Sequence, residues 1–288
     1  MVGGLRERER IRETFGRYVD ESVAATILRR QGEGALAGET GEATILFTDI
    51  AGFTTIAEYL QPHELVTALN EYLETVLAPI SAHGGVVNTF IGDGLFASFN
   101  MPLECDDHAA AAVRAAIDIQ RAVGARTFGD MGVSFATRIG ISTGAVIGGS
   151  VGAGQRMSFT LLGDTVNLAA RLEQLNKEYG TRILVSQSTR DACGERFAFQ
   201  PLGSVSVRGR SEQINIFSLD PGAPNGASID PFSGLFTWTP TPDQALDVSL
   251  YPITVRVTDD GTPPLNAAQT FTVTVLPQTQ ITVTNVAK

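Results

Sequence analysis

Residues 43–54 read ATILFTDIAGFT, and the expected fold of the larger part of the chain follows from this short run. Its first eight residues are mostly apolar or β-branched, which is typical of a buried strand. The strand ends at Asp49, and a short glycine-containing segment then leads into a helix. Backbone N–H groups at such a turn can bind phosphate oxygens, and a carboxylate at the strand end can hold a metal ion against them. A lone aspartate at a strand end is also a common structural feature, so this run needs support from elsewhere.

Outward from this run, apolar strands alternate with amphipathic helices as far as about residue 219, which predicts an α+β domain. Pro62 suits the first position of a helix, where the missing N–H costs no hydrogen bond. The tripeptide Gly92-Asp93-Gly94 is typical of a tight turn between two strands. The other expected elements are a helix over 106–123 capped by Asp106 or Asp107, strands at 133–142 and 145–149, a helix over 163–178 and short strands beyond it.

The two ends of the chain have different patterns. Residues 5–30 carry apolar residues at spacings of four, which predicts a helix, and a glycine-rich connector follows it. After residue 220 the helical period disappears, and the segments YPITVRVTDD and QTFTVTVLP alternate as strands do. We therefore expect three parts: an N-terminal helix and linker (1–41), a catalytic domain (42–219) and an all-β module (220–288).

The composition excludes several classes of protein. A net charge of −10 argues against a nucleic-acid partner, because phosphate backbones attract basic surfaces. No apolar run approaches the roughly 18 residues that span a membrane, and no signal peptide opens the chain, so we expect a cytoplasmic location with no membrane span in this chain. A membrane-associated parent architecture is the open alternative. Cys105 and Cys193 lack the spacing of a metal or redox site, which predicts two unpaired thiols in a reducing compartment.

Two further motifs strengthen the candidate site. If the strands around Asp93 neighbour the strand that ends at Asp49, both carboxylates meet at one edge of the sheet. Two carboxylates that share divalent cations are what a two-metal phosphoryl or nucleotidyl transfer requires. In GDTVNLAARLE (163–173), Asn167 and Arg171 are four residues apart and share one face of the expected helix. An amide and a guanidinium there can orient a ribose and stabilise a crowded phosphorus, although a solvated polar stripe is the simpler alternative.

Four motifs in this order resemble the catalytic domain of class III nucleotidyl cyclases: FTDIAGFT, GGVVNTFIGDGLFASF, RIGISTGAVIGGSVG and FTLLGDTVNLAARLE. The resemblance covers about residues 42–219. It implies a ferredoxin-like core of the βααβββαβ type, a head-to-tail homodimer with active sites at the interface, and two Mg²⁺ or Mn²⁺ ions per site. The reaction it implies is conversion of ATP to 3′,5′-cyclic AMP and pyrophosphate.

The resemblance also implies a role for individual residues. Asp49 and Asp93 match the two metal aspartates, and Ile50 lends a backbone carbonyl. Asn167 and Arg171 match the transition-state pair, which the other protomer supplies. The remaining implied substrate-binding residues are Arg208 for the terminal phosphates, Arg156 for the triphosphate, and Phe53, Thr54, Thr89 and Thr160.

Base selectivity is where the sequence departs from the family pattern. Adenylyl cyclases of this family usually place a lysine where this chain has Thr89, and Thr160 is the partner position. A guanine pocket would more readily offer a carboxylate to the base, and neither threonine supplies one, so we expect ATP to be preferred over GTP. The alternatives are a guanylate cyclase and a catalytically weak, cyclase-like nucleotide-binding module with a regulatory role.

Both flanking segments also have resemblances. The N-terminal helix resembles the signalling helix of membrane-bound sensor cyclases, although a simple coiled coil is equally consistent with it. The tail, with SIDPFSGLFTWTP and VRVTDDGTPPL, resembles part of a cadherin-like, immunoglobulin-type repeat that lacks its opening strands. Asp259 and Asp260 there are calcium-ligand candidates or ordinary turn residues. An adhesion protein that acts through this tail is the third reading of the sequence.

Overall fold

A computed structural model describes residues 38–153, 156–206, 213–219, 228–230, 233–240, 249–258 and 266–275. The expected N-terminal helix, Arg208 and the pair Asp259 and Asp260 lie outside the described residues. The chain divides into two compact units: Met1–Cys193 with Pro201–Ser218, and Gly194–Gln200 with Leu219–Lys288.

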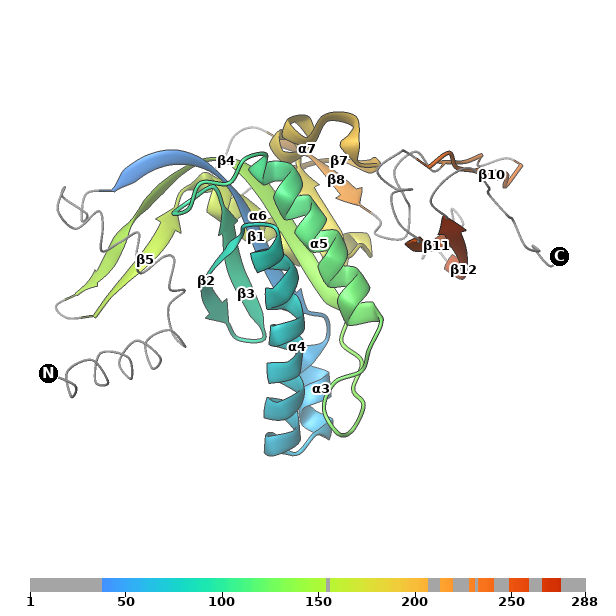
Figure 1. The fold of residues 1–288 in the computed structure, drawn as a ribbon, viewed down its shortest axis with the longest axis horizontal. Helices are drawn as coiled ribbons and strands as arrows, with labels where there is room; N and C mark the ends of the chain where they lie inside the picture. Colours follow the sequence, from blue (N-terminus) through green and yellow to red (C-terminus); the bar gives the residue numbers. More distant parts are fainter. Residues whose placement is uncertain are drawn as a thin grey trace, which may run out of the picture. The chain divides into compact units, whose positions relative to one another are not determined.

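The main sheet is mixed, and its strand order is β2-β3-β1-β4-β6-β8-β7, with β5 paired to β4 (Figure 1). This arrangement confirms the expected α+β class. The elements in chain order are β1 (Glu39–Ile50), α3 (Phe53–Tyr59), α4 (Pro62–Ala82), β2 (Val86–Ile91), β3 (Gly94–Phe99), α5 (His108–Gly124), β4 (Thr137–Ala153), β5 (Arg156–Leu162), α6 (Asp164–Tyr179), β6 (Ile183–Ser186), α7 (Gln187–Cys193), a 3-10 turn (Gly194–Arg196), β7 (Phe199–Ser206) and β8 (Gln213–Leu219).

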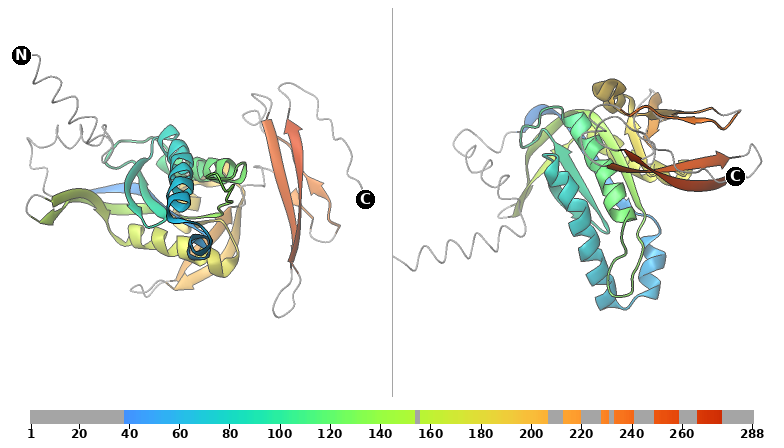
Figure 2. Two further views of the ribbon diagram at one scale, coloured as in Figure 1. Left: turned by 90° about the horizontal axis from the view of Figure 1, so that it is seen from below. Right: turned by 45° about the vertical axis from the view of Figure 1, so that its right-hand side comes forward.

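Helices cover the two faces of this sheet unequally (Figure 2). On one face α4 and α5 lie together: the hydroxyls of Tyr72 and Thr137 share a hydrogen bond of 3.1 Å, and Gln120 Nε2 donates to the carbonyl of Thr137 at 2.7 Å. Helix α6 packs on the opposite face. It approaches β4 so closely at Gly140 that a Cβ there would lie 2.2 Å from the carbonyl oxygen of Ala169 on α6. Successive residues of β4 point to opposite faces, so this strand contacts both layers.

Strand β1 lies at the centre of the sheet, between β3 and β4. Its register places Phe47 opposite Phe96, and the two rings stack with centroids 5.0 Å apart. On the other side Asp49 lies opposite Arg138. Because β1 has a paired strand on each side, its backbone hydrogen bonds are satisfied and its polar end is held at a fixed place beside β4.

The termini of several elements match the sequence expectations. Helix α4 begins at Pro62, and Gln61 and Glu64 form a capping box at its start. Asp107 occupies the position before α5, but its side chain pairs with Arg114 at 3.7 Å and makes no capping hydrogen bond. Neither Cys105 nor Cys193 forms a disulfide bond in the part of the chain that the structure describes.

The expected pair of strands at 133–142 and 145–149 is wrong. The structure has one strand, β4, that continues through Gly144 to Ala153, and a strand β5 that the sequence analysis did not predict. Taken without the rest of the sheet, the glycines in TGAVIGGSVG predict an interruption of the strand. Pairing with β1 over residues 137–148 and with β5 over 147–153 supplies ladder hydrogen bonds that carry the strand through them.

In the second unit the described residues form two short antiparallel pairs. Strand β9 (Ser228–Ile229) pairs with β10 (Phe236–Thr237), and β11 (Ser249–Thr258) pairs with β12 (Asn266–Val275). The last pair confirms the two alternating strands expected from the sequence. In the described part of the chain, no helix combines the length and apolar character needed to cross a membrane.

Candidate active site

Two carboxylates meet where β1 ends beside the β2–β3 turn. Asp49 is the second-last residue of β1, and Asp93 lies in the turn between β2 and β3. The backbone N–H of Ile50 donates a hydrogen bond of 3.1 Å to Asp93 Oδ2. A second hydrogen bond runs from the N–H of Leu95 to the hydroxyl of Thr48, at 3.2 Å. These two bonds fix the turn against the end of β1.

The glycines of the turn explain how it can come so close. Gly92 has a φ of 61°, a left-handed conformation that favours glycine. A Cβ on Gly94 would lie 1.8 Å from the carbonyl oxygen of Thr48, which no side chain could tolerate. The sequence GDG is therefore needed here both for the turn and for its contact with β1.

The proximity of Asp49 changes the proton affinity of Asp93. Burial raises the pKa of Asp93 above its ordinary value, and the negative charge of Asp49 raises it further, against the hydrogen bond from Ile50. Both effects penalise the ionised form, and a bound cation would remove the repulsion. Carboxylate oxygens are the ligands that Mg²⁺ and Mn²⁺ prefer, so the chemistry of these two residues fits the implied metal site.

Two charged residues that the sequence analysis missed adjoin these acids. Arg138 Nη2 on β4 donates a hydrogen bond of 2.5 Å to Asp49 Oδ2. Glu173 on α6 lies beyond it, with Oε1 3.5 Å from Arg138 Nε. Burial, followed by the charges of Asp49 and Asp93, raises the pKa of Glu173 to about 7, although Arg138 lowers it. The acids and Arg138 therefore form one continuous charged cluster.

Gly140 allows α6 to come close enough for Glu173 to join this cluster. A Cβ at that position would lie 2.2 Å from the backbone nitrogen of Glu173. Both Arg138 and Glu173 belong to motifs quoted from the sequence, RIGIST and NLAARLE. The contact between Arg138 and Glu173 depends on strand register and on helix packing, and neither can be predicted from the spacing of residues within a motif.

Asn167 and Arg171 lie on the exposed side of α6. Thr165, Leu168, Ala169 and Leu172 bury the other side of that helix against the sheet. Arg171 Nη2 is 3.8 Å from Glu178 Oε1, and its side chain is 47% exposed. Among the described contacts, none joins Asn167 or Arg171 to Asp49 or Asp93. Within one chain the two halves of the predicted site therefore stay apart.

The other predicted residues are spread over three elements. Thr89 is exposed on β2 just after a register shift, and its hydroxyl donates to the carbonyl of Phe90 at 3.4 Å. Thr160 lies on β5 opposite Gly149. Phe53 and Thr54 begin α3, behind Gly52 with its φ of 73°. Arg156 begins β5, opposite Ala153.

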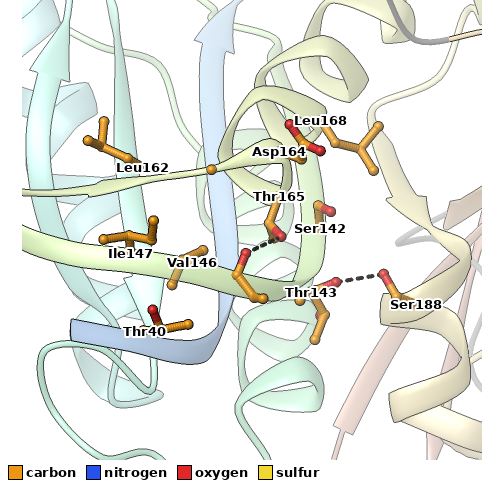
Figure 3. A pocket seen from close by; sticks show the side chains of 13 residues that line it. Thr40, Ser142, Thr143, Val146, Ile147, Leu162, Asp164, Thr165, Leu168 and Ser188 are labelled. Carbon is orange, nitrogen blue, oxygen red and sulfur yellow. Dashed lines mark hydrogen bonds between the residues drawn. The ribbon is translucent and has the colours of Figure 1, made fainter. Parts of the chain in front are cut away.

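A pocket of about 540 Å³ lies at the other end of β1, where Thr40 is opposite Ile147 (Figure 3). Two of its polar side chains are hydrogen-bonded to backbone carbonyls: the Thr165 hydroxyl donates to Ala145 at 2.8 Å, and the Ser188 hydroxyl to Thr143 at 2.7 Å. None of the predicted site residues lines it. The pocket is therefore separate from the carboxylates.

Comparison with known proteins identifies similar chains. A family model described as the adenylate and guanylate cyclase catalytic domain matches residues 36–220, and a model of a putative Ig domain matches residues 183–276. Adenylate cyclase 1 of Rhizobium meliloti (strain 1021) is 37% identical over 209 residues, which are 72% of this chain and 31% of that protein. The chain thus spans less than half of this longer relative.

Solved structures of both nucleotide specificities are similar to the chain. A bacterial light-regulated adenylyl cyclase has a TM-score of 0.67 and 29% identity, over 76% of this chain and 64% of that one. The guanylyl cyclase Cya2 has a TM-score of 0.58 and 30% identity, over 69% of this chain and 98% of that one.

Proposed function

Because this chain belongs to the adenylate and guanylate cyclase catalytic domain family, we propose that it converts ATP to 3′,5′-cyclic AMP and pyrophosphate. The observation that carries the proposal is the position of Asp93, whose carboxylate accepts a hydrogen bond from Ile50 right beside Asp49. Two acids held this way at the end of a central strand form a site for divalent cations. The adenylate cyclase relative and the adenylyl cyclase structure support the choice of reaction.

Asp49, Asp93 and the backbone carbonyl of Ile50 would hold two Mg²⁺ or Mn²⁺ ions. When bound, such ions make the ribose 3′-hydroxyl more acidic and offset the charge on pyrophosphate. The protein's own contribution is to hold the two acids close together: the N–H of Ile50 donates a hydrogen bond to Asp93, and Arg138 donates one to Asp49.

The reaction needs no nucleophile from the protein. The ribose 3′-oxygen forms a bond to the α-phosphorus while the bond between that phosphorus and the α–β bridging oxygen breaks. The hydroxyl proton leaves to solvent, and pyrophosphate departs with the bridging oxygen. In this scheme Asn167 orients the ribose, and Arg171 stabilises the charge on the crowded phosphorus. Arg156 and Arg208 bind the phosphates.

A second copy of the chain would supply Asn167 and Arg171. Both side chains are exposed on α6 and make no contact with the acids of their own chain among the described residues. A head-to-tail homodimer would bring them over the acids of the partner and create two composite sites. We place this assembly in the cytoplasm, where ATP is available, with residues 42–219 as the catalytic domain and 220–288 as the Ig-type module.

Thr89 and Thr160 would contact the base. A neutral hydroxyl makes a weaker contact with adenine N1 than a lysine does, so we expect a high KM for ATP and some turnover of GTP. The threonine at position 89 and the similarity to a guanylyl cyclase structure keep guanylate cyclase activity as the second candidate. An assay of cyclic nucleotide and pyrophosphate from ATP and from GTP with Mn²⁺ separates the two. Faster turnover of GTP would overturn the adenylate assignment, and no product from either would leave a nucleotide-binding module.

A further inference from the structure

Arg138 lies between two carboxylates of different character. One is Asp49, whose side chain is 31% exposed and which accepts the hydrogen bond from Arg138 Nη2. The other is Glu173, whose side chain is only 12% exposed. Both pairs form on the α6 face of the sheet, because Asp49 and Arg138 are opposite each other in the register of β1 and β4. The guanidinium of Arg138 can therefore form its ion pair with either carboxylate.

The contact with Glu173 is incomplete in this arrangement. Arg138 Nε and Glu173 Oε1 are 3.5 Å apart, and both atoms are buried without a hydrogen-bond partner. Buried charged groups without hydrogen-bond partners lower the stability of the folded state. Such a pair therefore persists only where another interaction keeps the two groups apart. Here the hydrogen bond to Asp49 holds the guanidinium on the other side.

We propose that Arg138 is an internal counter-ion that neutralises Asp49 in the metal-free protein and transfers to Glu173 when a divalent cation binds. The inference rests on the proposed function only in placing that cation at Asp49 and Asp93. Glu173 is then a positioning residue, which acts on the cation site through Arg138. Nothing in the family comparison assigns this role to it.

The charges explain why the transfer must occur. A cation at Asp49 competes for the oxygen that Arg138 now occupies, and it repels a guanidinium at that distance. Glu173 offers the displaced group a buried carboxylate oxygen that is already within 3.5 Å. The backbone of Glu173 is fixed against Gly140, so rotation of the side chains completes the bond without movement of α6.

The test is a calorimetric titration of the full chain with Mn²⁺ alone, at about pH 8, above the pKa of Glu173. The variants are Glu173→Gln, Arg138→Met and the double variant, with Asp49→Asn to locate the cation. We expect Glu173→Gln to weaken Mn²⁺ binding about tenfold, and Arg138→Met to strengthen it, because the competing charge is gone. In the Arg138→Met background, Glu173→Gln should change the affinity by less than about twofold.

A matched control is Glu178→Gln, which removes an exposed carboxylate from the same helix and should leave Mn²⁺ affinity unchanged. If Glu173→Gln has the same effect in wild type and in Arg138→Met, Glu173 acts on the cation directly. The inference about Arg138 would then fail, while the proposed metal site would stand. Unchanged binding by Asp49→Asn would sink the proposed metal site together with the inference. If Arg138→Met does not fold, as judged by circular dichroism, Arg138→Gln takes its place in the cycle.

Discussion

The Cα of Gly94 faces the carbonyl oxygen of Thr48 so closely that an added Cβ would stand 1.8 Å from that oxygen. The turn that carries Asp93 therefore rests on the strand that carries Asp49. The distance between the two acids is set by this backbone contact, and only a glycine permits it. Activity should be correspondingly sensitive to one methyl group at this position.

Gly94→Ala should destabilise the protein by roughly 2–4 kcal/mol and abolish cyclase activity, because the added methyl group must push the turn off β1. Urea denaturation and product formation from ATP measure the two effects. Gly124→Ala is the matched control, since nothing lies within 4 Å of an added Cβ at the end of α5. That control should keep its activity. Full activity in Gly94→Ala would show that the spacing of the acids does not matter.

Asp93→Asn should remove activity while leaving the metal-free protein as stable as wild type or slightly more so. The asparagine Oδ1 can still accept the hydrogen bond from Ile50, whereas the repulsion with Asp49 disappears. We expect a gain of at most about 1 kcal/mol, because solvent screens this partly exposed group. Thermal unfolding with a chelator present measures it. A clear loss of stability would contradict the view that the two acids repel each other.

The stability of the metal-free protein should fall as the pH rises from about 4.5 to about 7. The pKa of Glu173 is raised in the folded state, so the folded state holds its proton over this window while the unfolded state has released it. The stabilisation is complete below the unfolded pKa and is lost as the pH rises through about 7. At about 1.4 kcal/mol per pKa unit, the shift corresponds to roughly 3 kcal/mol, which screening by solvent reduces to about 2 kcal/mol.

Denaturant unfolding of wild type and Glu173→Gln over this range, with a chelator present, measures the effect of Glu173. The difference between the two proteins should change with pH only between the two pKa values. A constant difference would mean that Glu173 titrates at its ordinary value. Glu178→Gln, at an exposed site on the same helix, should follow the wild-type curve throughout.

The sequence predicted the location of the acids better than their surroundings. The GDG turn and the strand end at Asp49 are local patterns, and both appear in the structure where they were expected. The continuity of β4 was missed because its pairing with β1 and β5 overrides the glycines within it. Arg138 and Glu173 were missed for a related reason: their contact needs both a strand register and the close packing of α6 on Gly140. The exposed stripe of Asn167 and Arg171 was predictable from helical spacing alone.

Deletion of residues 225–288 should leave cyclase activity within roughly twofold of the full chain, because every residue proposed for the site precedes residue 225 and function resides in the site. The carboxylates, the exposed stripe of α6 and the strands β1 to β6 of the main sheet belong to the first unit. Product formation by the shortened chain, with its oligomeric state measured by light scattering, tests this expectation. Loss of activity in a shortened chain that is still dimeric would assign a catalytic role to the Ig-type module.

The proposed homodimer makes the sharpest prediction, because it would draw the two halves of each site from different chains. Asp93→Ala would remove a proposed metal ligand, and Asn167→Ala the amide proposed to orient the ribose, so each variant alone should be inactive. In a mixed dimer, however, the Asn167→Ala chain supplies intact acids and the Asp93→Ala chain supplies an intact Asn167, which rebuilds one complete site. Since half of randomly paired dimers are mixed and each has one site, we expect about a quarter of wild-type activity. A mixture of Asp93→Ala with Asp49→Ala should stay inactive, because both changes fall in the same half. If mixed dimers of Asp93→Ala and Asn167→Ala form but show no activity, the composite arrangement is contradicted. Asp49, Asp93, Asn167 and Arg171 would then belong to a site within one chain.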